Sequence, residues 1–175
     1  MVALADLRKK KLAQFAKEEG LLNLKGDINK AGHEIEKFLA PFRKELGKSN
    51  PRFLDPTFGA DWCAAFVYYL AVKAGYDLDI KPFQNRRGTF GLVGMWFEWS
   101  INEGKFKDIL YEPEPGDLIL YDRLVSDSEL DHMGIVLENK DKHCITAEGN
   151  VNNMTGIFRT LALNFLFNPA LYAPF

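Results

Sequence analysis

The sequence predicts an α+β fold, in which helices come first and an antiparallel sheet follows and packs on one of them. Apolar residues recur at helical spacing in the first part of the chain. The second part consists of short segments in which apolar and polar residues alternate, separated by turn residues. Between the two parts, residues 62–74 are apolar on nearly every side, which is typical of a helix buried in the core.

Helical spacing first appears over residues 4–19, and Gly20 is suited to end that helix. A second helix is predicted over residues 34–46. Pro41 lies inside it and should cause a kink or a break, because proline has no amide hydrogen to donate. Residues 47–60 are rich in proline, glycine and asparagine, which predicts a loop.

The apolar segment of residues 62–74 is the third predicted helix, with Asp61 as its N-cap and Gly75 as its end. Residues 76–91 have an irregular composition that favours no element. Residues 92–103 carry several aromatic side chains and are predicted to form a shorter helix.

A turn at residues 113–116 precedes a strand predicted over residues 117–121. Residues 132–138 and 143–148 both alternate, and the sequence Asn-Lys-Asp-Lys between them indicates a hairpin. Further strands are predicted over residues 157–163 and 170–173.

Bulk properties exclude several classes of protein. A length of 175 residues is typical of one domain, and a net charge of −2 offers no basic face of the kind that binds nucleic acid. The two cysteines are expected to be free thiols, because a disulfide scaffold would contain more. No apolar run approaches the roughly 20 residues that span a bilayer, so no membrane contact is expected. The N-terminus does not resemble a signal peptide, so the chain as written is expected in the cytoplasm.

Cys63 falls near the second position of the predicted buried helix. The backbone N–H groups there lack helical partners and the helix dipole is positive, and both effects favour a thiolate. Cys63 is therefore a candidate nucleophile. The alternative is a small buried cysteine with a structural role, which is common in core helices.

His132 opens one strand of the predicted hairpin and is the candidate base. If His132 lies opposite Glu148, Gly134 faces Thr146 and the apolar residues of both strands share the other face. Glu148 could then accept a hydrogen bond from the imidazole and orient it. Asn150, two residues further on, could do the same, and the sequence does not decide between the two residues.

Other residues are weaker candidates. Trp62, Trp96 and Tyr121 could line a substrate groove, although aromatic residues at helical spacing more often belong to the core. The sequence indicates no catalytic role for four other residues: Asp131 next to His132, His33, His143 and the second cysteine, Cys144. The sequence has no zinc motif and no phosphate-binding loop, so neither a metal nor another cofactor is expected.

Three stretches together resemble the CHAP family, the cysteine- and histidine-dependent amidohydrolases and peptidases of the papain-like group. Residues 61–67 resemble the helix that carries the nucleophile of the family. Residues 115–121 resemble its Pro-Gly-Asp turn and first strand. Residues 131–138, followed by Glu148-Gly149-Asn150, resemble its histidine strand and its polar-partner strand.

The resemblance implies a papain-like α+β fold over residues 31–175, preceded by a helical extension of residues 1–30. It implies Cys63 as nucleophile, His132 as base and Glu148 or Asn150 as the orienting group. Some members bind calcium through an aspartate-rich loop before the nucleophile. Here only Asp55 and Asp61 occupy that region, so no such site is predicted.

The resemblance also implies hydrolysis of amide bonds through a thioester. The usual substrate is bacterial peptidoglycan, cut by an N-acetylmuramoyl-L-alanine amidase or by an endopeptidase, and the protein would act at the cell wall if exported or released. We expect a monomer. The alternatives are an inactive relative that binds wall fragments or a protein, an amidase acting on other amides, and a delivered toxin domain with an immunity protein as its partner.

Overall fold

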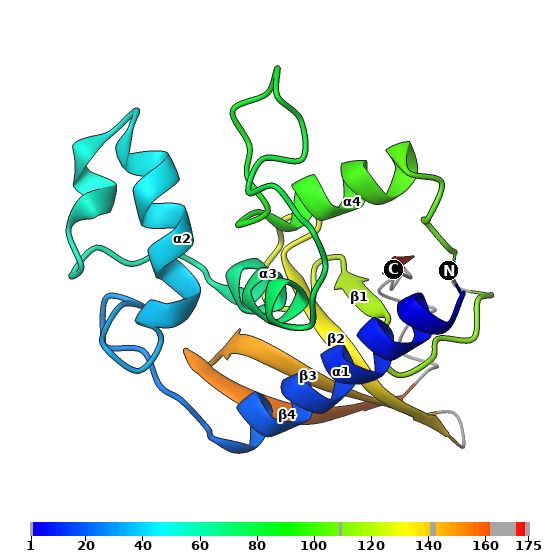
Figure 1. The fold of residues 1–175 in the computed structure, drawn as a ribbon. Helices are drawn as coiled ribbons and strands as arrows, with labels where there is room; N and C mark the ends of the chain where they lie inside the picture. Colours follow the sequence, from blue (N-terminus) through cyan, green and yellow to red (C-terminus); the bar gives the residue numbers. More distant parts are fainter. Residues whose placement is uncertain (1, 109, 141–142, 162–170, 174–175) are drawn as a thin grey trace.

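The structure is a computed structural model, which describes residues 2–108, 110–140, 143–161 and 171–173. Helices come first and strands follow, so the predicted α+β class is confirmed (Figure 1). The helices are α1 (Val2–Leu21), α2 (Glu36–Gly47), the short 3-10 helix η1 (Pro51–Leu54), α3 (Cys63–Lys73) and α4 (Val93–Asn102). The strands are β1 (Leu118–Tyr121), β2 (His132–Lys140), β3 (His143–Val151), β4 (Met154–Leu161) and β5 (Leu171–Ala173).

The strands form one sheet in the order β4-β3-β2-β1-β5, and each neighbouring pair is antiparallel. Helix α3 packs against β2 and β3 in the middle of this sheet, and α1 packs across β2, β3 and β4. Figure 1 shows α2 and α4 on either side of the start of α3. This arrangement leaves the N-terminal end of α3 between two helices, close to the end of the sheet where β2 begins.

The core lies between α3 and the sheet. Most side chains of α3 are buried, as its apolar composition predicts. Strand residues alternate between the two faces of the sheet. Leu118, Met133 and Ala147 belong to the cluster that contains α3, whereas Val136 and Cys144 belong to a second cluster. The alternation read from the sequence thus gives the correct face for Met133, Val136, Cys144 and Ala147.

Two local expectations are corrected by the structure. A kink or a break was predicted at Pro41; helix α2 is continuous through this residue, so the break is absent. Asp61 is not the N-cap of α3, because that position belongs to Trp62, which makes no capping hydrogen bond with its side chain. The Asp61 carboxylate instead binds the ammonium group of Lys30 and the side-chain amide of Asn150.

The register of the β2–β3 hairpin differs from the predicted one by two residues as far as Val136 and by three beyond it. Glu148 lies opposite Gly134, and Val136 lies opposite Thr146. The last pair of the hairpin is Lys140 and His143, so β2 continues two residues beyond its predicted end at residue 138. The pairing of β2 with β3 is irregular just after Val136. Residues 141–142 of the turn lie outside the described residues. Up to Val136, the shift of two keeps each side chain on its predicted face, because the side chains of a strand repeat with a period of two.

Helix α1 is tied to the turn before β1 by an ion pair. The ammonium group of Lys9 lies 2.8 Å from a carboxylate oxygen of Asp117, whose side chain is 0% exposed. The same ammonium group binds Glu114 at 2.8 Å. The backbone also approaches closely here, since a Cβ built on Gly116 would lie 2.4 Å from the carbonyl oxygen of Lys9.

In the described part of the chain, no helix is both long and apolar enough to cross a membrane.

Candidate active site

Three elements bring Cys63, His132 and Glu148 together. Cys63 is the first residue of α3, His132 is the first residue of β2, and Glu148 lies in the middle of β3. The His132 ring is hydrogen-bonded to the Cys63 side chain and, through Nε2, to Oε2 of Glu148 at 2.7 Å. Since Nε2 binds Glu148, Nδ1 is the nitrogen left for Cys63. This arrangement of thiol, imidazole and carboxylate is the one that activates a nucleophile.

Cys63 occupies a position suited to a nucleophile. The first hydrogen bond of α3 runs from the amide of Phe66 to the carbonyl of Trp62, so the amide of Cys63 itself has no helical partner. The positive end of the helix dipole favours a negative charge at this point. The side chain is 4% exposed and forms part of the wall of a cleft.

The Glu148 carboxylate is held by two further hydrogen bonds. Its Oε1 atom accepts a bond of 3.0 Å from the hydroxyl of Tyr121 and one of 2.5 Å from the hydroxyl of Thr146. The side chain is only 4% exposed, and a buried carboxylate requires such partners to stay charged. Tyr121 also stacks on His132, with ring centroids 5.8 Å apart. Tyr121 and Thr146 therefore fix the carboxylate so that Oε2 points at the imidazole.

Gly134 gives Glu148 the room to reach His132. The two residues Gly134 and Glu148 are direct partners across the strands, and His132 is the diagonal neighbour. A Cβ built on Gly134 would lie 2.6 Å from Cγ of Glu148. Long side chains can bridge a diagonal separation in a sheet, and here the missing side chain lets the carboxylate do so.

The environment of His132 favours its charged form. Burial alone would lower the pKa of the imidazole, since a charge is less stable away from water. The hydrogen bonds to Cys63 and Glu148, and the negative charges of these groups, outweigh burial and raise the pKa from 6.5 to about 10. The raised pKa favours the protonated ring, an imidazolium that is hydrogen-bonded to Cys63 and Glu148.

Asn150 was the other candidate for orienting His132, and it has a different contact. Its side-chain amide donates a hydrogen bond of 2.9 Å to Asp61. Burial would raise the pKa of Asp61, but the hydrogen bonds from Lys30 and Asn150, and the nearby charges of Lys30 and His132, lower it. Of the two orienting residues that the sequence offers, Glu148 is the one in contact with the imidazole.

The three aromatic residues predicted to contact substrate lie in the core instead. Trp62 and Trp96 are 0% exposed and Tyr121 is 1% exposed, so none of them forms the wall of a groove. Trp62 donates its indole hydrogen to Asn153, and Trp96 donates to the carbonyl of Phe90. Their rings are thus removed from water while their indole hydrogens are hydrogen-bonded, which is how tryptophan is accommodated in a core.

The remaining candidate residues lie outside the set of hydrogen bonds that joins Cys63, His132 and Glu148. Burial, followed by the charges of Glu148 and Asp117, raises the pKa of the Cys144 thiol to about 12. The Asp131 carboxylate accepts hydrogen bonds from the backbone amides of residues 124–126 and so shapes the loop before β2. His143 lies at the turn end of β3, away from the end where β2 begins. His33 lies between α1 and α2 and takes part in none of the hydrogen bonds that assemble the site described above.

A cleft of about 490 Å³ opens beside Cys63. Its walls come from α2, η1, the start of α4 and the loop before β2. Within the described ranges, no cluster of three or more histidine, cysteine, aspartate or glutamate side chains is placed to hold a metal ion.

Sequence reasoning missed the residues that hold the site in place. Thr146 shares a strand face with Glu148, so the alternation of β3 contains a signal for that contact. The contact of Tyr121 with Glu148 and the space at Gly134 require the sheet order and the register. Arg43 of α2 binds the segment before α3 and had no signal in the sequence.

Three comparisons with known proteins relate the chain to a family. The model of the CHAP domain family matches residues 55–150, which is more than half of the 175 residues and includes Cys63, His132 and Glu148. A search of curated proteins found no match. Among solved structures, the chain is similar to "The crystal structure of Ly7917", with a TM-score of 0.45 and 10% identity. That similarity covers 95% of this chain and 62% of the other, so it spans less than two thirds of the solved protein. Because the family model covers more than half of the sequence, this chain belongs to the CHAP domain family, whose members are generally amidases and peptidases.

Proposed function

We propose that the protein hydrolyses amide bonds, with Cys63 as nucleophile, His132 as acid and base, and Glu148 as the group that orients and charges His132. The observation that carries this proposal is the position of the imidazole, hydrogen-bonded to the Cys63 side chain and to the Glu148 carboxylate. Such a chain of thiol, imidazole and carboxylate serves nucleophilic catalysis and has no evident purpose in a surface that only binds.

The proposed reaction passes through a thioester. The Cys63 thiolate attacks the carbonyl carbon of the amide, and the carbonyl oxygen becomes an anion. The backbone N–H of Cys63, which has no partner within α3, stabilises that anion. His132 gives its proton to the amide nitrogen, the C–N bond breaks, and the amine leaves. Water then adds to the thioester and its proton passes to His132. The C–S bond breaks to release the acid and restore the thiolate.

The proposed substrate is bacterial peptidoglycan. Membership of the CHAP domain family supports this substrate class. Two kinds of bond fit the same chemistry: the amide between N-acetylmuramic acid and L-alanine, and an amide within the stem or cross-bridge peptide.

The test uses purified peptidoglycan and the variant Cys63→Ala. The unmodified protein should release new amino groups, and mass analysis of the soluble fragments should identify the bond that is cut. Cys63→Ala should release none, whereas Cys144→Ala, which changes the other buried thiol, should retain activity. Equal release by Cys63→Ala and the unmodified protein would contradict the mechanism.

Thiol labelling separates an enzyme from an inactive relative. At neutral pH iodoacetamide should modify Cys63 much faster than Cys144, because it reacts with thiolates and burial keeps the Cys144 thiol protonated. Intact mass and peptide mapping identify the modified residue. Equal labelling of the two thiols would favour a protein that only binds.

A further inference from the structure

The residue that precedes Cys63 is fixed in the core of the protein. Trp62 is the N-cap of α3, and its backbone carbonyl accepts the amide of Phe66 at 2.9 Å. Its side chain is fully buried and stacks on Phe38, with ring centroids 5.6 Å apart. The ring also lies against β3, since a Cβ built on Gly149 would come within 2.7 Å of it. Because Trp62 and Cys63 are consecutive, the position of the indole constrains the position of the sulfur.

Asn153, in the turn between β3 and β4, supplies the acceptor for the buried indole. The N–H of Trp62 donates to its Oδ1 atom at 3.1 Å, and a donor away from water needs such a partner. The Nδ2 atom of Asn153 donates to the backbone carbonyl of Asp27 at 2.6 Å. An indole only donates and a carbonyl only accepts, so the two contacts together set the orientation of the Asn153 amide.

Asn153 is also bound to the segment that follows α1. Its backbone carbonyl accepts the amide of Gly26 at 2.9 Å, and a Cβ built on Gly26 would overlap with the Asn153 side chain. Next to them, the amide of Leu24 donates to the hydroxyl of Thr155, and the amide of Thr155 donates to the carbonyl of Leu24, both at 2.9 Å. Figure 1 shows this segment passing the end of the β3–β4 hairpin on its way to α2. The Asn153 amide therefore has little freedom to move away from the indole.

The turn of residues 27–31 contacts the chain just before α3 at two further points. The ammonium group of Lys30 binds the Asp61 carboxylate. The backbones are also in close contact, because a Cβ built on Gly59 would overlap with the carbonyl oxygen of Asn29. The segment after α1 thus reaches both residues that precede the nucleophile, one directly and one through the β3–β4 turn.

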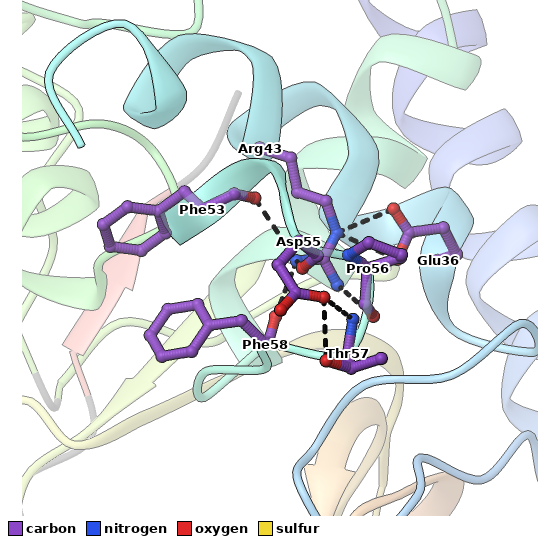
Figure 2. Close-up of polar contacts among 7 residues, drawn as sticks. All are labelled: Glu36, Arg43, Phe53, Asp55, Pro56, Thr57 and Phe58. Atoms are coloured by element: carbon purple, nitrogen blue, oxygen red, sulfur yellow. Dashed lines mark hydrogen bonds and ion pairs between the residues drawn. The ribbon is translucent and has the colours of Figure 1, made fainter. Parts of the chain in front are cut away.

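Arg43 of α2 holds the same stretch of chain further from α3 (Figure 2). Its Nε atom donates to both carboxylate oxygens of Glu36, at 2.7 and 3.0 Å. Its terminal nitrogens donate to the backbone carbonyls of Asp55, Phe58 and Pro56, at 2.8, 2.6 and 3.1 Å. Arg43 therefore orders the approach to α3, whereas the β3–β4 turn acts on the residue next to the nucleophile.

We propose that Asn153 is a positioning residue for the proposed reaction. By holding the indole of Trp62, it sets the place of the Cys63 sulfur against the imidazole of His132. The inference rests on the proposed function, since it assumes that Cys63 is the nucleophile. The contact joins the region that the family model matches, residues 55–150, to a part of the chain outside it. A displacement of about 1 Å can cost about 100-fold in rate, so a contact this close to the nucleophile affects the chemistry.

The test compares Asn153→Gly with Asn152→Gly. Both residues lie in the same turn with positive φ, at 62° and 51°, a conformation that glycine adopts without strain. Asn153→Gly removes the acceptor of the indole and should slow the modification of Cys63 by iodoacetamide at neutral pH about tenfold, since a sulfur displaced from the imidazole is less often a thiolate. Asn152 is exposed, and Asn152→Gly should leave the rate unchanged. An unchanged rate in Asn153→Gly would overturn the inference.

A second pair of variants asks whether Asn153 acts through Trp62. Trp62→Phe keeps an aromatic ring and removes the indole N–H, so it should slow the labelling of Cys63 to a similar extent. In that background Asn153→Gly should cause no further loss, because the contact is already gone. Losses that simply add would mean that Asn153 acts by another route, and the assignment would be wrong.

The titration of His132 distinguishes positioning from a general loss of stability. Burial lowers the pKa of the ring, and the hydrogen bond to Cys63 is the largest of the contributions that raise it to about 10. Moving the sulfur away should lower this pKa in Asn153→Gly, and NMR of the ring protons measures it. Urea denaturation gives the stability of each variant, and a protein that is merely less stable keeps its His132 pKa. An unchanged pKa in folded Asn153→Gly would contradict the proposed role.

Labelling of the unmodified protein separates this inference from the proposed function. If iodoacetamide does not modify Cys63 faster than Cys144, the proposed function fails first. If it does, and Asn153→Gly is labelled as fast as the unmodified protein, the positioning role of Asn153 alone is refuted.

Discussion

Nε2 of His132 lies 2.7 Å from Oε2 of Glu148, although Glu148 stands directly opposite Gly134 in the neighbouring strand. The carboxylate reaches the imidazole diagonally, across the position where Gly134 has no side chain. The contact that charges and orients the base therefore depends on a glycine that takes no part in the chemistry.

Gly134→Ala should disturb this contact. The new methyl group would lie 2.6 Å from Cγ of Glu148, so the carboxylate must move away from His132. We expect kcat/KM for amide hydrolysis to fall by up to about 100-fold, the cost of misplacing a group by about 1 Å. Gly94→Ala in α4 is the control, because a Cβ at Gly94 meets nothing within 4 Å. Wild-type kcat/KM in Gly134→Ala would show that the diagonal contact is dispensable.

Glu148→Gln should change the pH dependence of the reaction. Glu148 helps to raise the pKa of His132 from 6.5 to about 10, so the imidazolium is lost as the pH rises through about 10. Removing the negative charge lowers this pKa, and the basic limb of the kcat/KM profile should move to lower pH. The activity itself should fall on the order of 100-fold.

The raised pKa of His132 also predicts that the stability of the protein depends on pH. A raised pKa contributes to the free energy of unfolding fully below pH 6.5, and the contribution is lost as the pH rises from 6.5 through about 10. The stability difference between the unmodified protein and Glu148→Gln should therefore shrink over this interval. Denaturation of both proteins at a series of pH values measures this difference. In the kinetic experiment, a basic limb of the kcat/KM profile that does not move in Glu148→Gln would argue against the role assigned to Glu148.

Lys9→Met should lower the free energy of unfolding by about 3–5 kcal/mol. It would leave the buried Asp117 carboxylate without its cation, and breaking a buried pair from one side has this cost. Lys48→Met is the matched control, since Lys48 is 66% exposed and should change stability by less than about 0.5 kcal/mol. Urea denaturation measures both variants. A loss as small as that of the control would show that the ion pair with α1 is unimportant.

Arg43→Lys should loosen the wall of the cleft without removing the positive charge. A lysine ammonium cannot reproduce the planar fork that reaches Glu36 and several carbonyl oxygens at once. We expect a loss of about 1–3 kcal/mol in stability and faster amide exchange over residues 53–58. The reciprocal change Lys44→Arg, at the exposed neighbouring position, should have neither effect. Unchanged exchange in Arg43→Lys would refute the role of Arg43 in ordering this segment.

The sequence by itself determined the order of elements and the faces of the two strands that carry His132 and Glu148. Local periodicity carries that information, so the buried helix at Cys63 and the shared face of His132 and Glu148 could be predicted. The register could not, because a shift of two residues keeps every side chain on its face. Glu148 consequently reaches His132 from a position opposite Gly134 and not from directly across.

Only the tertiary structure decided which partner each polar group has. Whether Glu148 or Asn150 orients His132 depends on distances between strands, and the structure gives Glu148 the imidazole and Asn150 the Asp61 carboxylate. Trp62 and Trp96 are in the core because their indole hydrogens find acceptors there, far along the chain or on a loop. The ion pair of Lys9 with Asp117 joins residues that local patterns cannot relate. Periodicity reports burial within one element, whereas these contacts arise only when separate elements pack together.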